Sequence, residues 1–432
     1  MFGKYKYTYK LQHKINLVFS ITLAFTLLTV IIAGVWLTGS ELVAKDRQLI
    51  QKVGESTVLN LEKQTLFAEN IVATIAALAI SSRDINHLKM QLEYQIKALP
   101  KDLAITSVGV WPKPFSLDPG RKKASLFWAR DESGTFVFSN SYNDPRVADY
   151  FIQEWYLPTQ FIQNDGCYWS RSYTDIVSKE PMVTCAKSLT VNGVFQGVAS
   201  IDISLSGLKS NLQDIMKNTQ GYALLLDRNN TFIATPGIDY QKNVLGLKQK
   251  PVRFEKSLTE QQKINEHFKP LDTILKDSRS EILHSQNSKL SEYLNHTASD
   301  ISPLESINIV RSLYDTKQQL HSKRFTMEHD PLFEESAEVV YLHMPKTYWV
   351  VILVFPKRLV LAKAKAVSFQ LFLIMMIGIL IGALFLSYTL RRILIQPLRA
   401  MISTLRDKPH DEIPLIGNND EISELAQVYN NK

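Results

Sequence analysis

The chain has 432 residues, of which 49 are Lys or Arg and 42 are Asp or Glu, so its formal net charge is +7. Hydrophobic residues make up 45%, which excludes a disordered tail or a collagen-like fibre, and the small positive excess does not indicate a nucleic-acid partner. Two cysteines exclude a disulfide-dense scaffold, and no motif for a metal, a phosphate group or another cofactor is present, so neither metal nor cofactor is predicted.

Two uncharged apolar stretches stand out along the chain. The first covers residues 15–40 and follows a basic N-terminal segment, residues 1–14, while the second covers 366–390 and precedes Arg391-Arg392. Roughly 20 apolar residues cross a bilayer as a helix, so both stretches are predicted to be transmembrane helices. A cleaved signal peptide is the alternative for the first stretch, although its apolar part is longer than the roughly 7–15 residues of such peptides.

The flanking charges predict the orientation of these helices. Four lysines and no acid among residues 1–14 favour a cytoplasmic N-terminus, which places residues 41–365 outside the cytoplasm and 391–432 inside. The basic residues just before the second stretch oppose this orientation, but the first helix usually dominates.

The region between the two stretches is predicted to be α+β. Apolar residues recur at helical spacing and no proline occurs before Pro100, which predicts one long helix over 41–99. Asn192-Gly193 indicates a hairpin, and a polar helical insertion is expected within 245–330. Further elements are a helix at 205–219 and strands at 104–111, 125–129, 135–139, 167–173, 182–189, 197–203, 222–227, 232–234, 337–343 and 348–355.

This order of elements resembles the double Cache sensor domain of bacterial transmembrane receptors. The motifs that carry the resemblance are Trp155-Tyr156, the run from Trp169 to Asp175, and the strand from Gly197 to Leu205. The resemblance covers residues 41–365. It implies tandem PAS-like antiparallel sheets, with a distal unit over 100–205 and a proximal unit over 219–356 that contains the insertion at 245–330.

The resemblance also implies a ligand pocket on one face of the distal sheet. In this chain the matching aromatic and charged side chains are Tyr156, Trp169, Arg171, Tyr173, Asp175 and Asp202. Aromatic rings offer contact area, and carboxylates can neutralise an ammonium group. Asp202 lies in an apolar strand, where an unpaired carboxylate is costly to bury, and this favours a functional role. The alternatives are that Trp169 is a core residue and that Asp175 caps a turn before Ser178.

The class of ligand stays open at this point. In the amino-acid-binding branch of the family an Arg precedes the Trp-Tyr pair by two residues, and an acidic residue follows it by two. Those positions are Gln153 and Pro158 here. The amine half of an amino-acid site is therefore partly present, and the carboxylate half lacks its matching residue. An amine or amino-acid-like ligand, a polyamine or another small organic molecule all stay open as the ligand.

Cys167 and Cys185 are the only cysteines, and they flank two predicted strands joined by a turn. Antiparallel neighbours come close enough to bridge, and a periplasmic location permits oxidation. We therefore predict a disulfide, with two buried thiols as the alternative.

The C-terminal segment, residues 391–432, resembles a HAMP relay. Leu394 and Met401, and likewise Leu398 and Leu405, lie seven residues apart as in a coiled coil, and a second helix is expected to begin near Asp420. The resemblance implies a homodimer. A single amphipathic helix on the membrane surface is the alternative.

The sequence thus predicts an inner-membrane sensor with a large periplasmic domain. A small molecule would bind the distal unit, and the signal would pass through the second transmembrane helix and HAMP to an output module that these residues do not contain. The distal unit favours a diguanylate cyclase over a histidine kinase or chemoreceptor as that output. No enzyme activity is predicted for this chain. The rivals are a periplasmic enzyme with Asp175 and Asp202 as an acid–base pair, and a membrane-anchored adaptor without its own ligand.

Overall fold

The computed structural model describes residues 5–82, 84–100, 104–162, 166–245, 288–298, 300–314, 321–407, 427, 428 and 430. Its contacts divide the chain into two units, one formed by Met1–Asp46 with Val360–Lys432 and the other by Arg47–Leu359. Helix α1 (Tyr5–Ser81) and helix α8 (Lys357–Leu390) each contribute residues to both units.

The first unit contains apolar helical segments whose side chains are exposed. In α8 the 22 residues Phe369–Leu390 are long and apolar enough to cross a membrane, and none of them is buried. In α1 the shorter apolar segment Leu23–Ile32 likewise exposes Phe25 and Leu28. Exposed apolar side chains in such numbers favour an apolar surrounding, so Phe369–Leu390 is a candidate membrane helix. The other described helical segment that is long and apolar enough, Arg47–Ser81 of α1, is 28% buried, and Leu23–Ile32 alone is shorter than a membrane span. The side chains of residues 33–44 lie outside the described residues, so the bounds 15–40 stay a prediction.

The chain continues after α8 through a π-helical turn (Arg391–Ile395) into helix α9 (Gln396–Asp407). The second HAMP helix, expected from Asp420, falls almost entirely outside the described residues.

The second unit contains two antiparallel sheets. The distal sheet has the order β3-β2-β1-β7-β6-β4, with β5 also paired to β6. Asn192 and Gly193 form the two-residue turn between β6 and β7 with φ angles of 51° and 79°, as the hairpin signal predicted. The strands are β1 (Ile105–Pro112), β2 (Leu126–Arg130), β3 (Phe136–Ser139), β4 (Tyr168–Trp169), β5 (Tyr173–Thr174), β6 (Pro181–Val191) and β7 (Val194–Ser204).

The proximal sheet has the order β10-β11-β12-β8-β9. Strand β10 lies within the expected helical insertion, so that prediction is wrong at its C-terminal end: the polar stretch 321–327 pairs with β11 as an edge strand. The strands are β8 (Tyr222–Leu226), β9 (Phe232–Ala234), β10 (His321–Met327), β11 (Ala337–His343) and β12 (Val350–Pro356).

Helix α1 packs along both sheets through its residues 50–76. Gly54 allows a close approach to the proximal sheet, because a Cβ atom there would lie 2.7 Å from Leu342. The predicted helix 41–99 is interrupted near Ser82. Asp84 then caps the separate helix α2 (Ile85–Lys97) by accepting hydrogen bonds from the backbone N–H groups of Asn86 and His87.

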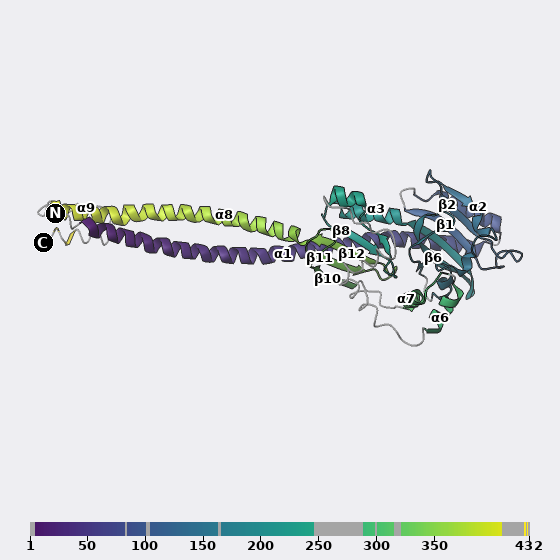
Figure 1. Ribbon diagram of the computed structural model, residues 1–432. Coiled ribbons are helices and arrows are strands. Elements are labelled where there is room, and N and C mark those ends of the chain that lie inside the picture. Colours follow the sequence, from purple (N-terminus) through teal and green to yellow (C-terminus); the bar gives the residue numbers. More distant parts are fainter. Residues whose placement is uncertain are drawn as a thin grey trace. The chain divides into compact units, whose positions relative to one another are not determined.

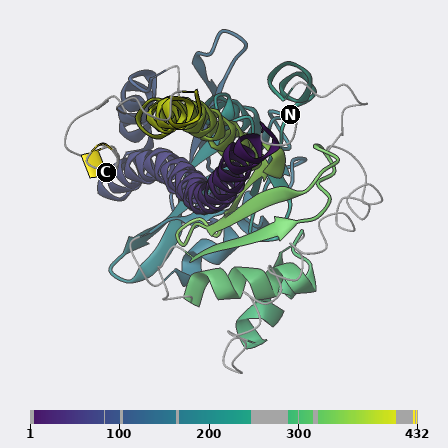
Figure 2. The same cartoon turned by 90° about the vertical axis from the view of Figure 1, so that its left-hand side faces the viewer.

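The remaining helices surround the sheets of this unit (Figure 1). Helix α3 (Leu205–Met216) joins the distal sheet to the proximal one, and α6 (Ser288–Thr297) and α7 (Pro303–Tyr314) belong to the insertion. In Figures 1 and 2, α6 and α7 lie at the lower edge of the unit, and α2 and α3 lie at the upper edge. Short helical turns cover Ser141–Asn143, Tyr150–Ile152, Leu157–Phe161 and Tyr240–Val244.

Candidate functional site

A cluster of buried aromatic side chains covers one face of the distal sheet. Its centre is Trp111 of β1, whose ring centroid lies 4.9 Å from those of both Tyr142 and Trp155 and 5.4 Å from that of Tyr150. Gly109 makes room for this arrangement, because a Cβ atom there would lie 2.5 Å from the Trp111 indole. The absence of a side chain at Gly109 thus lets the indole lie flat along its own strand.

Asp202 lies beside this cluster on the central strand β7. The register places it directly opposite Ser107 of β1 and Thr184 of β6, so three polar side chains stand in one row across the sheet. The Asp202 carboxylate accepts a hydrogen bond from the Ser107 hydroxyl and another, 2.7 Å long, from the Thr184 hydroxyl. Burial raises the pKa of Asp202 to about 7, the nearby charge of Asp175 also raises it, and the two hydroxyl donors oppose that shift.

Asp175 is the second buried carboxylate on this face. It accepts a hydrogen bond from the Tyr142 hydroxyl. Its other oxygen accepts from the backbone N–H groups of Val177, at 3.2 Å, and Ser178, at 2.6 Å. The turn-capping role considered for Asp175 is therefore present, and it coexists with the contact to Tyr142.

Two tyrosines complete the predicted residues on this face. Tyr173 shares a 2.7 Å hydrogen bond with Thr184, which links it to Asp202. Tyr156 packs in the aromatic cluster with 2% exposure, and its hydroxyl has no hydrogen-bond partner among the described residues. A buried hydroxyl without a partner costs about 1–3 kcal/mol, so a ligand that supplies one would gain affinity.

The structure therefore brings together Tyr156, Tyr173, Asp175 and Asp202. Sequence reasoning missed Ser107, Trp111, Tyr142 and Thr184, which surround the two acids. Ser107 and Trp111 alternate along β1 with period two, and this pattern alone could have placed them on one face.

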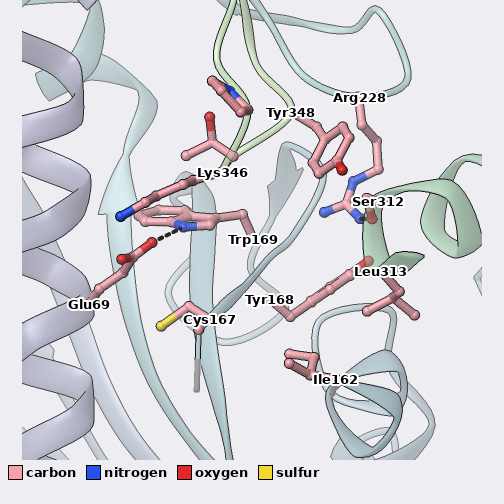
Figure 3. Close-up of a pocket in the computed structure, with 13 residues that line it drawn as sticks. Glu69, Ile162, Cys167, Tyr168, Trp169, Arg228, Ser312, Leu313, Lys346 and Tyr348 are labelled. Atoms are coloured by element: carbon pink, nitrogen blue, oxygen red, sulfur yellow. Dashed lines mark hydrogen bonds between the residues drawn. The ribbon is translucent and has the colours of Figure 1, made fainter. Parts of the chain in front are cut away.

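Trp169 and Arg171 lie apart from these four residues. The Trp169 indole points to α1 and donates a 3.0 Å hydrogen bond to Glu69 (Figure 3). The Arg171 guanidinium forms ion pairs with Asp300, at 2.9 Å, and with Glu305, at 2.7 Å, which lies in helix α7. Both side chains therefore connect the distal unit to neighbouring elements.

The two cysteines are free thiols in the structure. Trp169 of β4 lies opposite Cys185 of β6, so Cys167 lies diagonally across from Cys185 on the same face of the two strands. Burial raises the pKa of the Cys185 thiol well above its ordinary value, and a hydrogen bond with Cys167 adds to that shift. The thiols are thus in contact, and the predicted disulfide stays a prediction.

The charges on the distal face favour a cation. Asp175 and Asp202 are 5% and 4% exposed, and neither forms an ion pair with any residue that the structure describes. Buried carboxylates beside electron-rich aromatic rings attract an ammonium group by charge and by cation–π interaction.

Comparison with known proteins finds a family match over the distal unit. Residues 94–210 match the family model of the methyl-accepting chemotaxis protein-like first PDC sensor domain. This segment begins in the last turn of α2, contains the whole distal sheet and ends in the first half of α3, and it therefore includes every residue of the aromatic and acidic face. Among curated proteins, none matches the chain significantly.

Several solved structures are similar at low sequence identity. The extracellular domain described as that of histidine kinase mmHK1S-Z3 is 13% identical, with 74% of this chain and 97% of that chain covered and a TM-score of 0.45. Methyl-accepting chemotaxis protein X is 14% identical, with 72% and 99% covered and a TM-score of 0.42. The ligand-binding domain of the Campylobacter jejuni chemoreceptor Tlp3, in complex with L-norvaline, is 12% identical, with 74% and 94% covered and a TM-score of 0.42.

The α+β class expected from the sequence is confirmed, with candidate membrane helices and antiparallel sheets. Residues 94–210 are similar to a PDC sensor domain of the chemotaxis-receptor type, and the chain resembles bacterial membrane receptors with a Cache-like sensor, as its motifs implied.

Proposed function

We propose that this chain is an inner-membrane receptor subunit whose distal unit binds a small organic amine or an amino-acid-like ligand in the periplasm. The observation that carries the proposal is Asp202, a buried carboxylate that accepts hydrogen bonds from two hydroxyl groups and forms no ion pair within the described residues. Because a hydroxyl group can rotate about its C–O bond, the hydroxyls of Ser107 and Thr184 can turn away from Asp202. The carboxylate oxygens can then accept hydrogen bonds from an ammonium group.

Binding would be coupled to a change of shape. Aromatic side chains cover Asp202 in this structure, so a ligand must displace some of them to reach the carboxylate. A ligand shifts a conformational equilibrium by its differential affinity for the two states. The open, ligand-bound arrangement of the aromatic cluster is then one state, and the closed arrangement described above is the other.

The segment from Trp169 to Asp175 offers a route from this site to the proximal unit. Its C-terminal end carries Tyr173 and Asp175, which belong to the distal face. One residue before Tyr173, the backbone N–H of Ser172 donates a 3.0 Å hydrogen bond to Asp227, which directly follows β8. Trp169 contacts Trp349 beside β12, with ring centroids 5.3 Å apart. Movement at Tyr173 and Asp175 is thus passed to the proximal sheet.

Downstream of the sensor, we propose that the signal passes through α8 to a HAMP relay over 391–432 in a homodimer, and then to an output module such as a diguanylate cyclase. Support comes from the two heptad-spaced apolar pairs that follow the apolar segment of α8. An adaptor would use the insertion to contact a partner protein. The insertion helix α7 instead contacts the distal unit through the Arg171–Glu305 ion pair, which favours a sensor over an adaptor.

The proposal is tested by ligand-induced stabilisation of the full chain in detergent micelles. A panel of primary amines, diamines and amino acids is screened by thermal shift, since a ligand that binds the folded state raises its melting temperature. Asp202→Asn keeps the shape of the side chain and removes its charge, and we expect it to abolish the shift.

Asp118→Asn is the matched control, because Asp118 is an exposed carboxylate of the same unit. It should leave the shift unchanged. An equal shift in the Asp202→Asn and wild-type proteins would move the ligand site elsewhere.

A further inference from the structure

A second region of the sensor unit has the form of a ligand site, and its charge is opposite to that of the distal face. It is a cavity of about 340 Å³ at the junction of α1, β4, α7, the β8–β9 turn and the β11–β12 turn (Figure 3). Small-molecule sites usually enclose roughly 300–1,000 Å³, so this volume admits a small organic molecule.

The inner wall of the cavity carries Arg228, which is only 5% exposed. Its guanidinium lies over the ring of Tyr168, 4.4 Å from the centroid, and donates a 3.0 Å hydrogen bond to the Ser312 hydroxyl. The described residues hold no carboxylate within ion-pair distance of Arg228, and two acids that feel its charge, Glu154 and Glu305, bind Tyr168 and Arg171 instead. A guanidinium has five N–H donors, so Arg228 keeps donors for a further partner.

The remaining walls combine one more cation with two aromatic rings. Lys346, an exposed residue of the β11–β12 turn, lines the cavity together with Trp169 and Tyr348. Among the described residues that line the cavity, the one acid is Glu69, which already accepts the hydrogen bond from the Trp169 indole. The described lining thus holds two cations, Arg228 and Lys346, and one carboxylate, Glu69, that is already hydrogen-bonded. This charge balance favours an anionic ligand.

We propose that this cavity is a second ligand site of the receptor and that it takes a small organic carboxylate. A planar carboxylate matches the paired donors of Arg228, and the rings of Trp169 and Tyr348 can cover the apolar part of such a molecule. The space exceeds what a bare inorganic anion fills, which favours the organic molecule. This proposal does not depend on an amine site at Asp202.

A carboxylate in this cavity would contact three parts of the sensor at once. Trp169 belongs to the distal sheet, Arg228 and Tyr348 to the proximal unit, and Ser312 to the insertion helix α7. A ligand that touches all three stabilises their mutual packing, and so it biases the same junction through which the distal site would signal.

The test is isothermal titration calorimetry of the full chain in detergent micelles with sodium acetate, succinate and benzoate. Sodium chloride and sodium phosphate at matched ionic strength are the reference titrations. We expect saturable binding of at least one carboxylate, and at least about tenfold weaker binding in Arg228→Gln, because a charge-assisted hydrogen bond pair is lost. Arg121→Gln, an exposed arginine of the distal unit, should bind as the wild type does.

Two further variants keep the test decisive if Arg228→Gln fails to fold. Lys346→Glu changes an exposed residue and should weaken carboxylate binding several-fold, whereas Asp118→Asn, outside the cavity lining, should leave it unchanged. The proposal is overturned if no carboxylate binds saturably, if phosphate binds as tightly as the carboxylates, or if Lys346→Glu binds like the wild type.

Discussion

Two buried carboxylates, Asp202 of the distal unit and Asp330 of the proximal unit, accept hydrogen bonds from different kinds of donor. In the proximal unit Asp330 accepts hydrogen bonds from the Tyr222 hydroxyl, at 2.6 Å, and from the backbone N–H groups of Leu332 and Phe333, at 2.9 Å and 2.8 Å. In the distal unit the carboxylate of Asp202 accepts, among the hydrogen bonds described for it, only from the side-chain hydroxyls of Ser107 and Thr184. Backbone N–H groups are fixed by the fold, whereas hydroxyl groups can turn to other partners.

This difference distinguishes an acidic residue that stabilises the fold, here called a structural acid, from one that is available to a ligand, here called a binding acid. Asp330 holds the turn between β10 and β11 through the backbone N–H groups of Leu332 and Phe333. Asp202 holds no turn, and its donors can be satisfied elsewhere. A buried carboxylate that the fold does not need is the group that a ligand can use.

The largest change in stability that tests this comparison is expected when Asp330 is replaced. We expect Asp330→Ala to lower the free energy of unfolding of the proximal unit by about 3–6 kcal/mol, because three buried donors lose their acceptor. Urea unfolding of the full chain in micelles, followed by circular dichroism, measures the change.

Asp202→Ala is the matched distal variant, and we expect it to cost at least 2 kcal/mol less, because the Ser107 and Thr184 hydroxyls can turn to new acceptors. Equal costs for the two variants would contradict the distinction between a structural and a binding acid.

A second effect concerns the distal unit alone, through Cys167 and Cys185. We predict that the two thiols, which touch in this structure, form a disulfide in an oxidising compartment. Closing a loop of this length stabilises by about 3 kcal/mol, so dithiothreitol should lower the unfolding midpoint of the distal unit and leave the proximal unit unchanged. The same reagent should have no effect on Cys167→Ser.

Mass spectrometry after thiol alkylation checks the bridge directly. Neither cysteine should be labelled in protein isolated from membranes without reductant. Full labelling of both would refute the disulfide and leave two buried thiols.

The sequence predicted the distal unit better than the insertion, and the reason is physical. Alternating apolar residues and the Asn192-Gly193 turn specify strands and register locally, so the central hairpin of β6 and β7 was expected. Strand β10 is polar and pairs only at the sheet edge, where no local pattern reveals it.

The candidate site was predictable only in part for a similar reason. A functional role for Asp202 could be predicted because a charged residue interrupts an apolar strand. The direction of Trp169 depends on which face of β4 packs on α1, and this is decided by tertiary contacts such as the hydrogen bond to Glu69. Arg171 pairs with residues about 130 positions later in the chain, a separation that no local motif encodes.

The smallest effect, and the sharpest test of Asp202, is the pH dependence of stability. Burial raises the pKa of Asp202 to about 7 in the folded chain, whereas an unfolded aspartate has a pKa near 4. Between these values the folded state holds a proton that the unfolded state has lost, so stability falls as pH rises, by up to about 1.4 kcal/mol per pH unit from this group. Above about pH 7 this contribution levels off.

The difference between the wild type and Asp202→Asn isolates that contribution, because Asn does not titrate and the other acids, including Glu154, are common to both proteins. We expect the wild type to lose stability relative to Asp202→Asn between pH 5 and pH 7 in urea titrations, with no further divergence at pH 8. An amine ligand needs the ionised carboxylate, so its affinity for the wild type should rise over the same pH interval. Parallel stability curves for the two proteins would show that Asp202 is ionised throughout, and the buried, unpaired state assigned to it here would be refuted.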